Sequence, residues 1–374
     1  MLQPCGPILA FYELVAKAAG SLPFSSWTVG KPAFAGVVVY YIILGAALWA
    51  LGRWSEGRGE GRTFREDSTA DENQQGPYGA GGRSALIFAA FLLLTTSLLV
   101  ITLHFSVSKP PCVVMVDVDQ GDGIYVRTAK GLDIFVDGGS TGVSSVGKYR
   151  IQPFLKYNGV GSIDYWFVTH SDEDHISGLM EMMENGYRVK RLILSEYIVM
   201  NSNTEELIGL AELCGTEVMY MGVGDVLSDG SDSFTCVMPD IPAIGGEVDP
   251  NEQSLVLFYE TEKLSMLLTG DMGEAAEREL LKSWRWPDDG RVHILKVAHH
   301  GSKGSSCEDF LAMVGREDFT ALISVGPKNS YGHPHGDTLS RLGAAGATVK
   351  RTDLLGQITL KTGGKSVTIG GFLE

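Results

Sequence analysis

The chain has 374 residues, 44% of them hydrophobic, so it exceeds one average domain and can fill a substantial core. Its formal net charge is −15, and the acidic excess falls after Lys109, which argues against a broad basic surface for binding nucleic-acid phosphates. Its five cysteines are scattered without C-x-x-C spacing, a pattern that indicates neither a disulfide framework nor a thiolate zinc site.

The N-terminal third contains two long apolar runs. Residues 1–32 predict a short amphipathic helix that ends at Gly20 and Pro23 and lies at a membrane surface. Residues 33–52 are twenty residues without a charge, the length that a bilayer requires of a transmembrane helix. Residues 84–108 are a second uncharged run and predict a second transmembrane helix. A buried soluble helix is the alternative for the first run.

Between these runs, residues 53–83 are rich in Gly, Glu, Arg, Asp and Gln and predict a flexible polar loop. The loop holds five arginines, whereas the outer flanks of the two runs carry Lys17, Lys31 and Lys109. By the positive-inside rule the loop lies in the cytoplasm. The prediction is therefore a multi-pass protein of the cell membrane, with everything after Lys109 on the extracytoplasmic side.

From residue 110 to residue 374 the pattern is that of a soluble α/β domain. Apolar runs predict strands at residues 113–118, 124–126, 133–136, 165–168, 189–194, 217–220, 234–238, 254–259, 265–268, 292–297 and 320–324. Helical patterns cover residues 176–185, 204–214, 273–282, 307–314 and 338–345. Strands first, followed by mixed strands and helices, fit a layered sandwich with helices on the outside.

Metal-ligating residues are densest directly after the apolar strand at residues 165–168. The run from His170 to His175 contains two imidazoles, with Asp172 and Asp174 between them. Nitrogen and carboxylate ligands suit Zn²⁺ or Mn²⁺, and a turn that leaves the strand can aim one pair at each of two ions. The alternative is a solvated acidic turn with two surface histidines.

Further clusters of this kind stand at other predicted strand ends. Six of the eight histidines fall in three motifs, which makes chance clustering a poor explanation. The further clusters are Asp137-Gly138-Gly139, Thr269-Gly270-Asp271, His299-His300-Gly301-Ser302-Lys303 and Tyr331-Gly332-His333-Pro334-His335.

Together these motifs resemble the metallo-β-lactamase superfamily, and within it the C-terminal domain of the ComEC-type competence proteins, which take up DNA. The matching pieces appear in family order over about residues 112–340, and they include residues 117–122 and 251–256 besides the clusters above. Residues 21–26 and the apolar run after them resemble the end of that family's membrane competence domain. The implied fold is α/β, a four-layer αβ/βα sandwich preceded by two transmembrane helices.

The resemblance implies a hydrolase with two divalent metal ions, Zn²⁺ or Mn²⁺. The implied metal ligands are His170, Asp172, Asp174, His175, Asp271 and His300. Asp174 and His175 would hold one ion, and His170 with Asp172 the other. Asp271 would bridge the two ions and His300 would complete the second site. Among these residues, Asp172, Asp174 and Asp271 are expected to take part directly in catalysis.

A second group of residues is expected to orient a ligand or to contact substrate. Its members are Asp137, Asn251, His299, Ser302, Lys303, Tyr331, His333 and His335. Asp137 is expected to orient a ligand rather than to be one. Ser302 and Lys303 lie on a Gly-rich loop and are expected to bind a phosphate, although a solvated loop lysine is equally compatible with the sequence. Structural roles are the alternative for Asn251 and Tyr331.

The chain departs from the family pattern at several points. Asp172 stands where the superfamily usually has the second histidine of H-x-H-x-D-H, and residues 249–251 lack the histidine common there. His333 or His335 is an alternative ligand to complete that site. Asp119 stands where a glycine is common. An OB-like segment and most of the family's membrane helices are missing, so we expect a shortened or split version.

These features predict a membrane-anchored, metal-dependent phosphodiesterase or nuclease that acts on single-stranded or duplex DNA during uptake in transformation. Expected partners are DNA, the membrane and separately encoded channel or competence subunits. Two alternatives remain at this point: a non-catalytic docking subunit of a DNA-uptake channel, and a hydrolase of another small ester or phosphoester. Hydrolytic activity of the domain from residue 110 to residue 374 distinguishes an enzyme from a scaffold.

Overall fold

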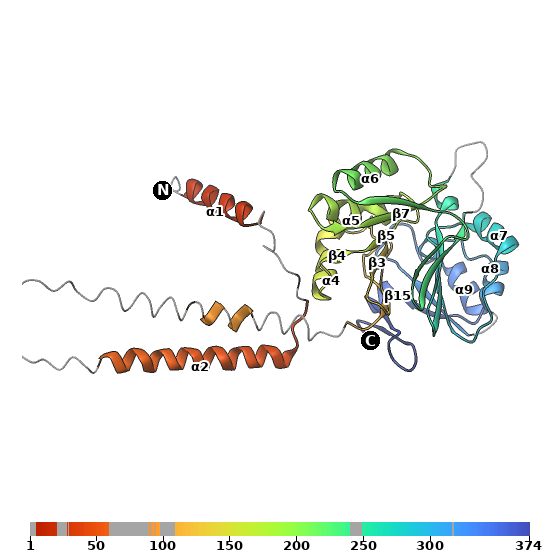
Figure 1. Ribbon diagram of the computed structural model, residues 1–374. Helices are drawn as coiled ribbons and strands as arrows, with labels where there is room; N and C mark the ends of the chain where they lie inside the picture. The colour runs from red at the N-terminus through yellow and green to blue at the C-terminus, as the bar shows by residue number, and fades with distance from the viewer. Residues whose placement is uncertain are drawn as a thin grey trace, which may run out of the picture. The chain divides into compact units, whose positions relative to one another are not determined.

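The computed structural model describes residues 5–20, 28, 30–59, 89, 91–93, 95–97, 109–239, 249–315 and 318–374 (Figure 1). The chain divides into two compact units, residues 1–108 and Lys109–Glu374. We call Lys109–Glu374 the C-terminal unit. It contains the two large sheets and a small two-stranded one.

The first unit contains helices α1 (Cys5–Gly20) and α2 (Phe34–Gly59). α1 ends at Gly20, as the sequence predicts, and α2 covers the apolar run of residues 33–52. The prediction of a loop from residue 53 is wrong for residues 53–59, which continue α2. Adding a residue to an existing helix needs no new nucleus, so the helix propagates past its apolar part. Residues 60–83 of the predicted loop lie outside the described residues.

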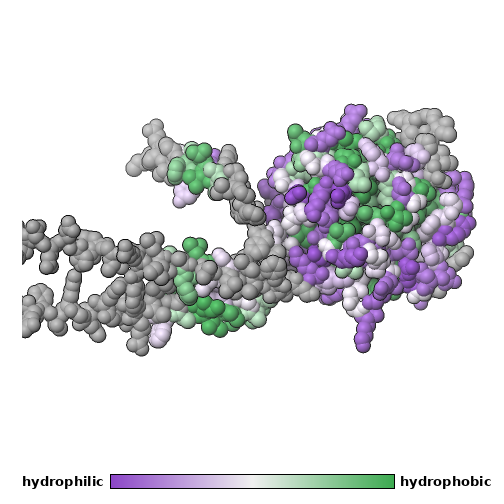
Figure 2. All heavy atoms as spheres, in the orientation of Figure 1, coloured by the Kyte–Doolittle hydropathy of each residue, from purple (hydrophilic) through white to green (hydrophobic). Residues whose placement is uncertain are grey.

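Most of the predicted span at residues 84–108 also lies outside the described residues. No helix among the residues that the structure describes is both long enough and apolar enough to cross a membrane. The structure thus shows neither of the two predicted transmembrane helices. Large apolar side chains of α1 and α2 are exposed, among them Leu9, Phe11, Phe34, Ile42 and Ile43. Hydrophobic patches are visible on these helices in Figure 2.

The C-terminal unit is built on two large sheets. The first has eight strands, in the order β17 (Thr368–Gly371), β16 (Ile358–Lys361), β1 (Cys112–Met115), β2 (Gly123–Arg127), β3 (Asp133–Asp137), β5 (Tyr165–Phe167), β7 (Arg191–Ser195) and β8 (Glu217–Met221). Its strands are antiparallel from β17 to β3 and parallel from β3 to β8.

The second sheet has seven strands, in the order β15 (Thr348–Arg351), β14 (Phe319–Ile323), β13 (Val292–Lys296), β12 (Leu264–Leu268), β11 (Val256–Glu260), β10 (Asp232–Met238) and β9 (Val226–Asp229). Strands β12 to β15 are parallel, and β9 to β12 are antiparallel. A small parallel pair joins β4 (Ser162–Ile163) and β6 (Arg188–Val189).

Helices cover the outer face of each sheet, so the unit has four layers (Figure 1). The helices next to the first sheet are α4 (Gln152–Tyr157), α5 (Glu173–Glu184) and α6 (Ser202–Leu213). Those next to the second sheet are α7 (Glu274–Ser283), α8 (Glu308–Val314) and α9 (Gly336–Ala344). Shorter turns are the π-helix η1 (Gly147–Ile151), the 3-10 turns η2 (Pro250–Gln253) and η3 (Ala298–Gly301), and α10 (Thr352–Leu355).

Three apolar clusters correspond to the three contacts between these layers. One packs α5 and α6 on the first sheet, with Trp166 and Leu179 as members, and one packs α7 to α9 on the second sheet. The third lies between the sheets and joins side chains such as Met115 and Met266. Because the central strands are covered on both faces, they read as continuous apolar runs, which made them recognisable in the sequence. The α/β sandwich predicted from the motifs is confirmed.

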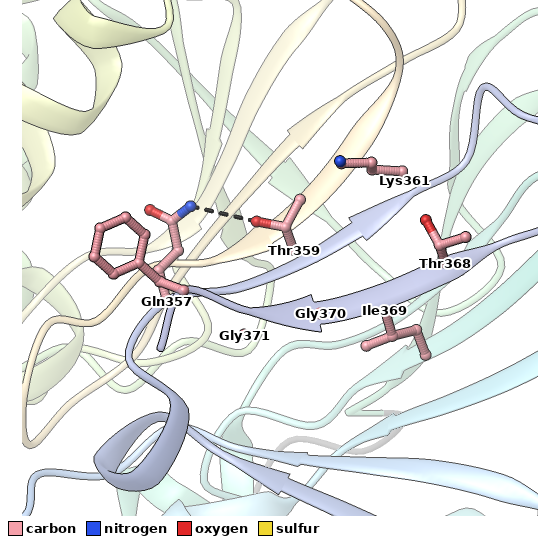
Figure 3. A pocket seen from close by; sticks show the side chains of 8 residues that line it. Gln357, Thr359, Lys361, Thr368, Ile369, Gly370 and Gly371 are labelled. Carbon is pink, nitrogen blue, oxygen red and sulfur yellow. Dashed lines mark hydrogen bonds between the residues drawn. The ribbon is translucent and has the colours of Figure 1, made fainter. Parts of the chain in front are cut away.

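A surface pocket lies at the edge formed by β16 and β17 (Figure 3). Its lining consists of Gln357, Thr359, Lys361, Thr368, Ile369, Gly370, Gly371 and Phe372. Gln357 donates to Thr359 Oγ1 within the pocket at 3.3 Å. None of these lining residues is a histidine or an acid, so this pocket is not the metal site that the motifs predict.

Candidate metal centre

The predicted ligand motifs meet where the two sheets come together. Asp137 ends β3, and the His170–His175 segment follows its parallel neighbour β5. Asp271 follows β12, and His300 follows the parallel strand β13. Because the carboxyl ends of parallel strands lie at the same edge of a sheet, each sheet brings two motifs to one place.

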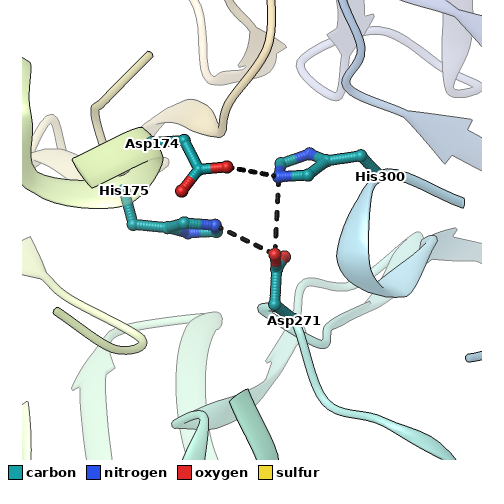
Figure 4. Close-up of side chains that lie close together, drawn as sticks. All are labelled: Asp174, His175, Asp271 and His300. Carbon is teal, nitrogen blue, oxygen red and sulfur yellow. Dashed lines mark ion pairs between the residues drawn. The ribbon is translucent and has the colours of Figure 1, made fainter. Parts of the chain in front are cut away.

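Four of the predicted ligands form a tight cluster (Figure 4). The Nε2 atom of His175 lies 3.3 Å from Oδ2 of Asp271, and Nε2 of His300 lies 3.4 Å from the same oxygen. Nε2 of His300 is also 3.3 Å from Oδ2 of Asp174. One ligand atom from each of the four residues lies within 4.8 Å of every other. Asp174 and His175 lie in the first turn of α5, which follows β5 of the first sheet; Asp271 follows β12 of the second sheet and His300 lies on η3 after β13.

This cluster has the chemistry of a cation site. The Nε2 atoms of His170, His175 and His300 are buried and have no hydrogen-bond partner. Leaving a buried polar atom unpaired is costly, and native structures rarely do so without a reason such as a bound ion. Imidazole nitrogens with carboxylate oxygens are ligands for Zn²⁺ and Mn²⁺. The residues present therefore fit a divalent metal.

Electrostatics in the cluster favour positive charge. Burial alone lowers the pKa of His300, but the carboxylates of Asp271 and Asp122 overcome it and raise that pKa to about 10. The pKa of His175 is likewise raised, because Asp271 and Asp137 outweigh the effect of burial. Burial raises the pKa of Asp174, but the contacts with His300 and His175 hold it below its usual range. The same field that holds protons on these imidazoles would hold a metal cation in their place.

The backbone around the two adjacent histidines is unusual. His299 and His300 both adopt left-handed conformations, with φ of 48° and 52°, and Gly301 follows with φ of 82°. Non-glycine residues rarely adopt this region, and such strain gathers at functional sites. The turn fixes His300 with Nδ1 3.0 Å from the carbonyl oxygen of Ser324, so Nε2 is left to face the cluster. The ring of His299 lies at the edge of the site, with its Nε2 atom 3.8 Å from Oδ2 of Asp271.

The other predicted ligand pair lies beside this cluster. The ring of His170 is centred 4.0 Å from that of His175, and its Nε2 lies 3.7 Å from Oδ2 of Asp172. Burial and His175 lower the pKa of His170 to about 3, so the imidazole is neutral at pH 7 and its Nε2 can bind a metal. Asp172 is more exposed, and its pKa is raised by partial burial and by Asp174. The number of ions that the two groups hold stays a prediction.

The aromatic rings of His333 and Tyr331 lie near the ligands. The ring of His333 lies 5.5 Å from that of His299 and 6.3 Å from that of His300, and Tyr331 stacks on it at 5.7 Å. Asn329 holds this loop, because its side chain donates to the carbonyl oxygen of His333 at 2.7 Å and accepts from its backbone N–H at 2.9 Å. These contacts place His333 and Tyr331 beside the ligands, and their role toward substrate stays a prediction.

Three other predicted residues have different contacts. The Nδ1 atom of His335 accepts a hydrogen bond from the backbone N–H of Asp337 and so caps α9. The Nζ atom of Lys303 lies 3.6 Å from Oδ2 of Asp337 in an exposed ion pair. Ser302 accepts the hydroxyl of Thr338 at its carbonyl oxygen, which ties the same loop to α9. The structure thus gives this part of the motif a role in the helix start, and places no contact between it and the four ligands.

Asn251 lies on η2, beside the strand ends. Its backbone N–H donates to Oδ1 of Asp249, and its own Oδ1 atom is buried without a hydrogen-bond partner. Ser254, at the end of the same turn, accepts the backbone N–H of Asp271 at 3.2 Å. The turn therefore supports Asp271, and the role of Asn251 toward substrate stays a prediction.

The backbone conformation of Asp119 explains why a glycine is common at this position in the family. Its backbone φ is 70°, in the left-handed region that glycine adopts freely and that Asp tolerates better than most residues. The Asp119 side chain accepts the backbone N–H of Gln120 at 2.9 Å, which stabilises the turn. This departure from the family pattern is therefore compatible with the fold.

Sequence reasoning missed two buried charged residues next to the ligands. Asp122 has Oδ1 3.5 Å from Nδ1 of His300, and it forms a second acidic group with Asp137 and His175. Lys296, the last residue of β13, forms buried ion pairs with Asp122 and Asp271. The available signal was a lysine at the end of a largely apolar strand, three residues before His299. Asp122 also stood in a matching motif, without an assigned role.

The fold and this site define a class of protein. A family model described as the metallo-beta-lactamase superfamily matches residues 116–325, more than half of the chain. The chain therefore belongs to the metallo-β-lactamase superfamily.

Curated relatives narrow this class. The chain is 32% identical over 285 residues to ComE operon protein 3 of Bacillus subtilis, a match that covers 71% of this chain and 36% of that protein. It is 28% identical over 260 residues to Recombination protein 2 of Haemophilus influenzae, covering 69% and 30%, and 28% identical over 251 residues to Competence protein ComA of Neisseria gonorrhoeae, covering 66% and 32%. The resemblance to ComEC-type competence proteins is thus confirmed. The chain spans about a third of the length of these relatives.

Among solved structures, the metallo-beta-lactamase fold protein YhfI from Bacillus subtilis aligns with a TM-score of 0.42 at 12% identity. The alignment covers 69% of this chain and 99% of that one.

Proposed function

We propose that the chain is a membrane-anchored, metal-dependent phosphodiesterase that hydrolyses DNA during its uptake. The observation that carries the proposal is the cluster of Asp174, His175, Asp271 and His300. The Nε2 atoms of its two histidines and of the neighbouring His170 are buried and make no hydrogen bond. Similarity to competence proteins supports DNA as the substrate class. Because the chain spans a part of those relatives, their whole activity is not assumed for it.

The ligand residues have defined parts in this proposal. The sequence-based expectation is that Asp271 bridges two ions and that His300 completes the site of His170 and Asp172. Because His300 instead clusters with Asp174, His175 and Asp271, these four residues would hold one divalent ion, and His170 with Asp172 would hold a second beside it. Divalent metals at such sites act as Lewis acids toward a phosphoryl oxygen and lower the pKa of water, which generates a nucleophile at neutral pH.

The residues around the ligands hold them in place. Asp137 accepts the backbone N–H and the hydroxyl of Thr169, at 2.8 and 2.9 Å, and so cannot turn away from His175. The peptide carbonyl of Asp137 accepts the indole N–H of Trp166 at 2.7 Å, which fixes the backbone as well. Tyr331 stacks on His333 beside the ligands and is exposed, so a nucleobase could stack on its free ring face.

The membrane part of the proposal comes from the sequence. The uncharged runs at residues 33–52 and 84–108 have the length of membrane spans, and apolar side chains of α1 and α2 are exposed. The arginine-rich segment between them favours a cytoplasmic loop. The C-terminal unit would then act on the extracytoplasmic side, where incoming DNA first meets the cell. Separately encoded channel subunits are the proposed partners.

Hydrolysis assays with defined metals test this function. The purified chain, stripped with a chelator, should cleave single-stranded or duplex DNA after Mn²⁺ or Zn²⁺ is restored. Under the proposal, Asp174→Ala removes both the activity and the bound metal. Metal binding without cleavage of any DNA would redirect the assignment to a smaller phosphoester, because the site would be intact while the substrate class was wrong.

A further inference from the structure

Lys296 carries a charge in the most buried part of the site. Its side chain is 1% exposed, and lysine is almost never fully buried unless it is paired. The ammonium contacts Oδ2 of Asp122 and donates to the carbonyl oxygen of Gly270 at 2.9 Å. It also lies 3.6 Å from Oδ1 of Asp271. All three protons of the ammonium therefore have an oxygen to face.

These contacts link the two sheets. Asp122 lies in the turn between β1 and β2 of the first sheet, and its backbone N–H donates to the carbonyl oxygen of Asp174 at 3.0 Å. Gly270 and Asp271 follow β12 of the second sheet. Lys296 thus contacts Asp122, which is hydrogen-bonded to the backbone of Asp174, and also Gly270, which precedes Asp271. It therefore connects two ligands that follow strands of different sheets.

The same contacts orient one carboxylate. Asp271 directs Oδ2 toward the Nε2 atoms of His175 and His300, at 3.3 and 3.4 Å, while Oδ1 faces Lys296. Rotating the carboxylate would take Oδ1 away from the ammonium. The carbonyl oxygen of Gly270 also accepts the backbone N–H of His299 at 3.2 Å, so the peptide before Asp271 is fixed from two directions.

We propose that Lys296 is a positioning residue of the metal centre, which aims Asp271 at the other ligands and keeps the Asp174 side of the cluster in register with it through Asp122. The inference rests on the proposed metal-binding function. Lys296 contacts the proposed ligand Asp271 and is not itself a proposed ligand.

Two other roles for this lysine predict different results. If the ammonium acted through its charge alone, it would repel a metal ion, so removing it would tighten metal binding. If it served folding alone, removing it would lower the stability of the metal-free protein and leave the metal affinity of folded molecules unchanged. Of the three roles, only the positioning role predicts that the folded variant binds metal more weakly.

The test uses two variants of the full chain. Lys296→Met leaves Asp122 as an unpaired buried carboxylate, which can prevent folding. The double variant Asp122→Asn with Lys296→Met removes both charges of the pair and is expected to fold. The matched control is Asp164→Asn with Lys190→Met, which removes another Asp–Lys ion pair of the C-terminal unit, away from the ligands.

Each protein is checked for folding by circular dichroism and then titrated with Mn²⁺ and Zn²⁺ against a competing chelator. The visible spectrum of the Co²⁺-loaded protein reports the ligand geometry directly. The double variant should bind each metal roughly 10–100-fold more weakly than the unmodified chain and show an altered Co²⁺ spectrum, as for other residues that orient ligands. The control pair should change neither property.

The outcomes separate this inference from the function on which it rests. Equal or tighter metal binding by the folded double variant, with an unchanged Co²⁺ spectrum, would overturn the positioning role and leave the proposed function standing. Failure of the unmodified chain to bind Mn²⁺, Zn²⁺ or Co²⁺ would overturn the proposed function, and the positioning role with it.

Discussion

Asp137 and His175 form a buried pair, with Oδ2 and Nδ1 3.0 Å apart, that leaves Nε2 of the same ring 3.3 Å from Asp271. One nitrogen of the imidazole is thus occupied by a supporting carboxylate, and the other faces the ligand cluster. Carboxylates that hold a metal-binding histidine in this way fix its ring and raise its basicity. The arrangement agrees with the expectation that Asp137 orients a ligand.

Substitutions at Asp137 and Asp174 should therefore differ in strength. Asp174→Ala removes a proposed ligand and is expected to abolish both bound metal and hydrolysis. Asp137→Ala removes support for His175 and is expected to weaken metal binding by roughly 10–100-fold while some activity remains. Metal content after dialysis and the rate of DNA hydrolysis measure both effects. Retained activity in Asp174→Ala would be incompatible with the ligand assignment.

Gly139 is predicted to be intolerant of a side chain. A Cβ atom there would lie 2.3 Å from the carbonyl oxygen of Glu173 and 2.5 Å from the backbone nitrogen of His175. Gly139→Ala should therefore displace the start of α5, lower stability by roughly 1–3 kcal/mol and weaken metal binding. Thermal unfolding and metal titration measure the two effects.

Gly209 supplies the matched control for that substitution. It lies within α6, and a Cβ atom there would meet nothing within 4 Å. Gly209→Ala should stabilise the protein by about 0.5–1 kcal/mol, because glycine is unfavourable inside a helix. If both alanine variants behaved alike, the close approach of Gly139 to the ligand loop would have no functional meaning.

Glu277 is predicted to make stability depend on pH. Its side chain is buried on α7 and accepts backbone N–H groups of Ser306 and Cys307, and burial raises its pKa from 4.5 to about 7. The folded state therefore binds a proton that the unfolded state releases between these values. The stabilising effect of that proton is fully present below pH 4.5 and is lost as the pH rises to 7, a change on the order of 3 kcal/mol.

Urea unfolding of residues 109–374 at pH 5 and pH 8 tests this dependence. The free energy of unfolding should fall between the two pH values in the unmodified protein. In Glu277→Gln the side chain at this position cannot ionise. The free energy of unfolding of this variant should therefore fall less between pH 5 and pH 8, by the amount that Glu277 contributes. Equal declines in the two proteins would show that Glu277 does not titrate in this range.

Tyr331 is predicted to bind substrate without affecting the metal. Its side chain is 56% exposed and stacks on His333 beside the ligands. Stacking of a nucleobase on an aromatic ring contributes about 1–3 kcal/mol, so Tyr331→Ala should raise KM for single-stranded DNA roughly 10-fold while metal content stays constant. Tyr331→Phe keeps the ring and should behave like the unmodified protein. An unchanged KM in Tyr331→Ala would place the DNA elsewhere.

Sequence patterns predicted most of the central strands and the edge strand β8, but they missed the central strand β16 and the other three edge strands. β5 and β12 are covered on both faces, so their apolar runs stood out. β9, β15 and β17 are edge strands with partly exposed, mixed residues, and no run of apolar residues marks them. Their pairing depends on neighbours distant in the chain, which a local pattern does not contain.

The site shows the same division between local and distant information. The motifs predicted the ligands because each motif is a short run of ligating residues, such as His170 to His175. Lys296 and Asp122 are separated by most of the domain, and their pairing arises because the turn after β1 meets the end of β13. His335 was expected near the ligands because of its motif, but its Nδ1 atom caps α9.

The most direct test of the central claim is hydrolysis of DNA by the purified chain after chelator treatment, with Mn²⁺ or Zn²⁺ restored and Asp174→Ala as the control. The account predicts cleavage that requires the metal and disappears in Asp174→Ala together with the bound metal. Cleavage that persists in the stripped protein or in Asp174→Ala would contradict a metal-dependent site built on Asp174, His175, Asp271 and His300.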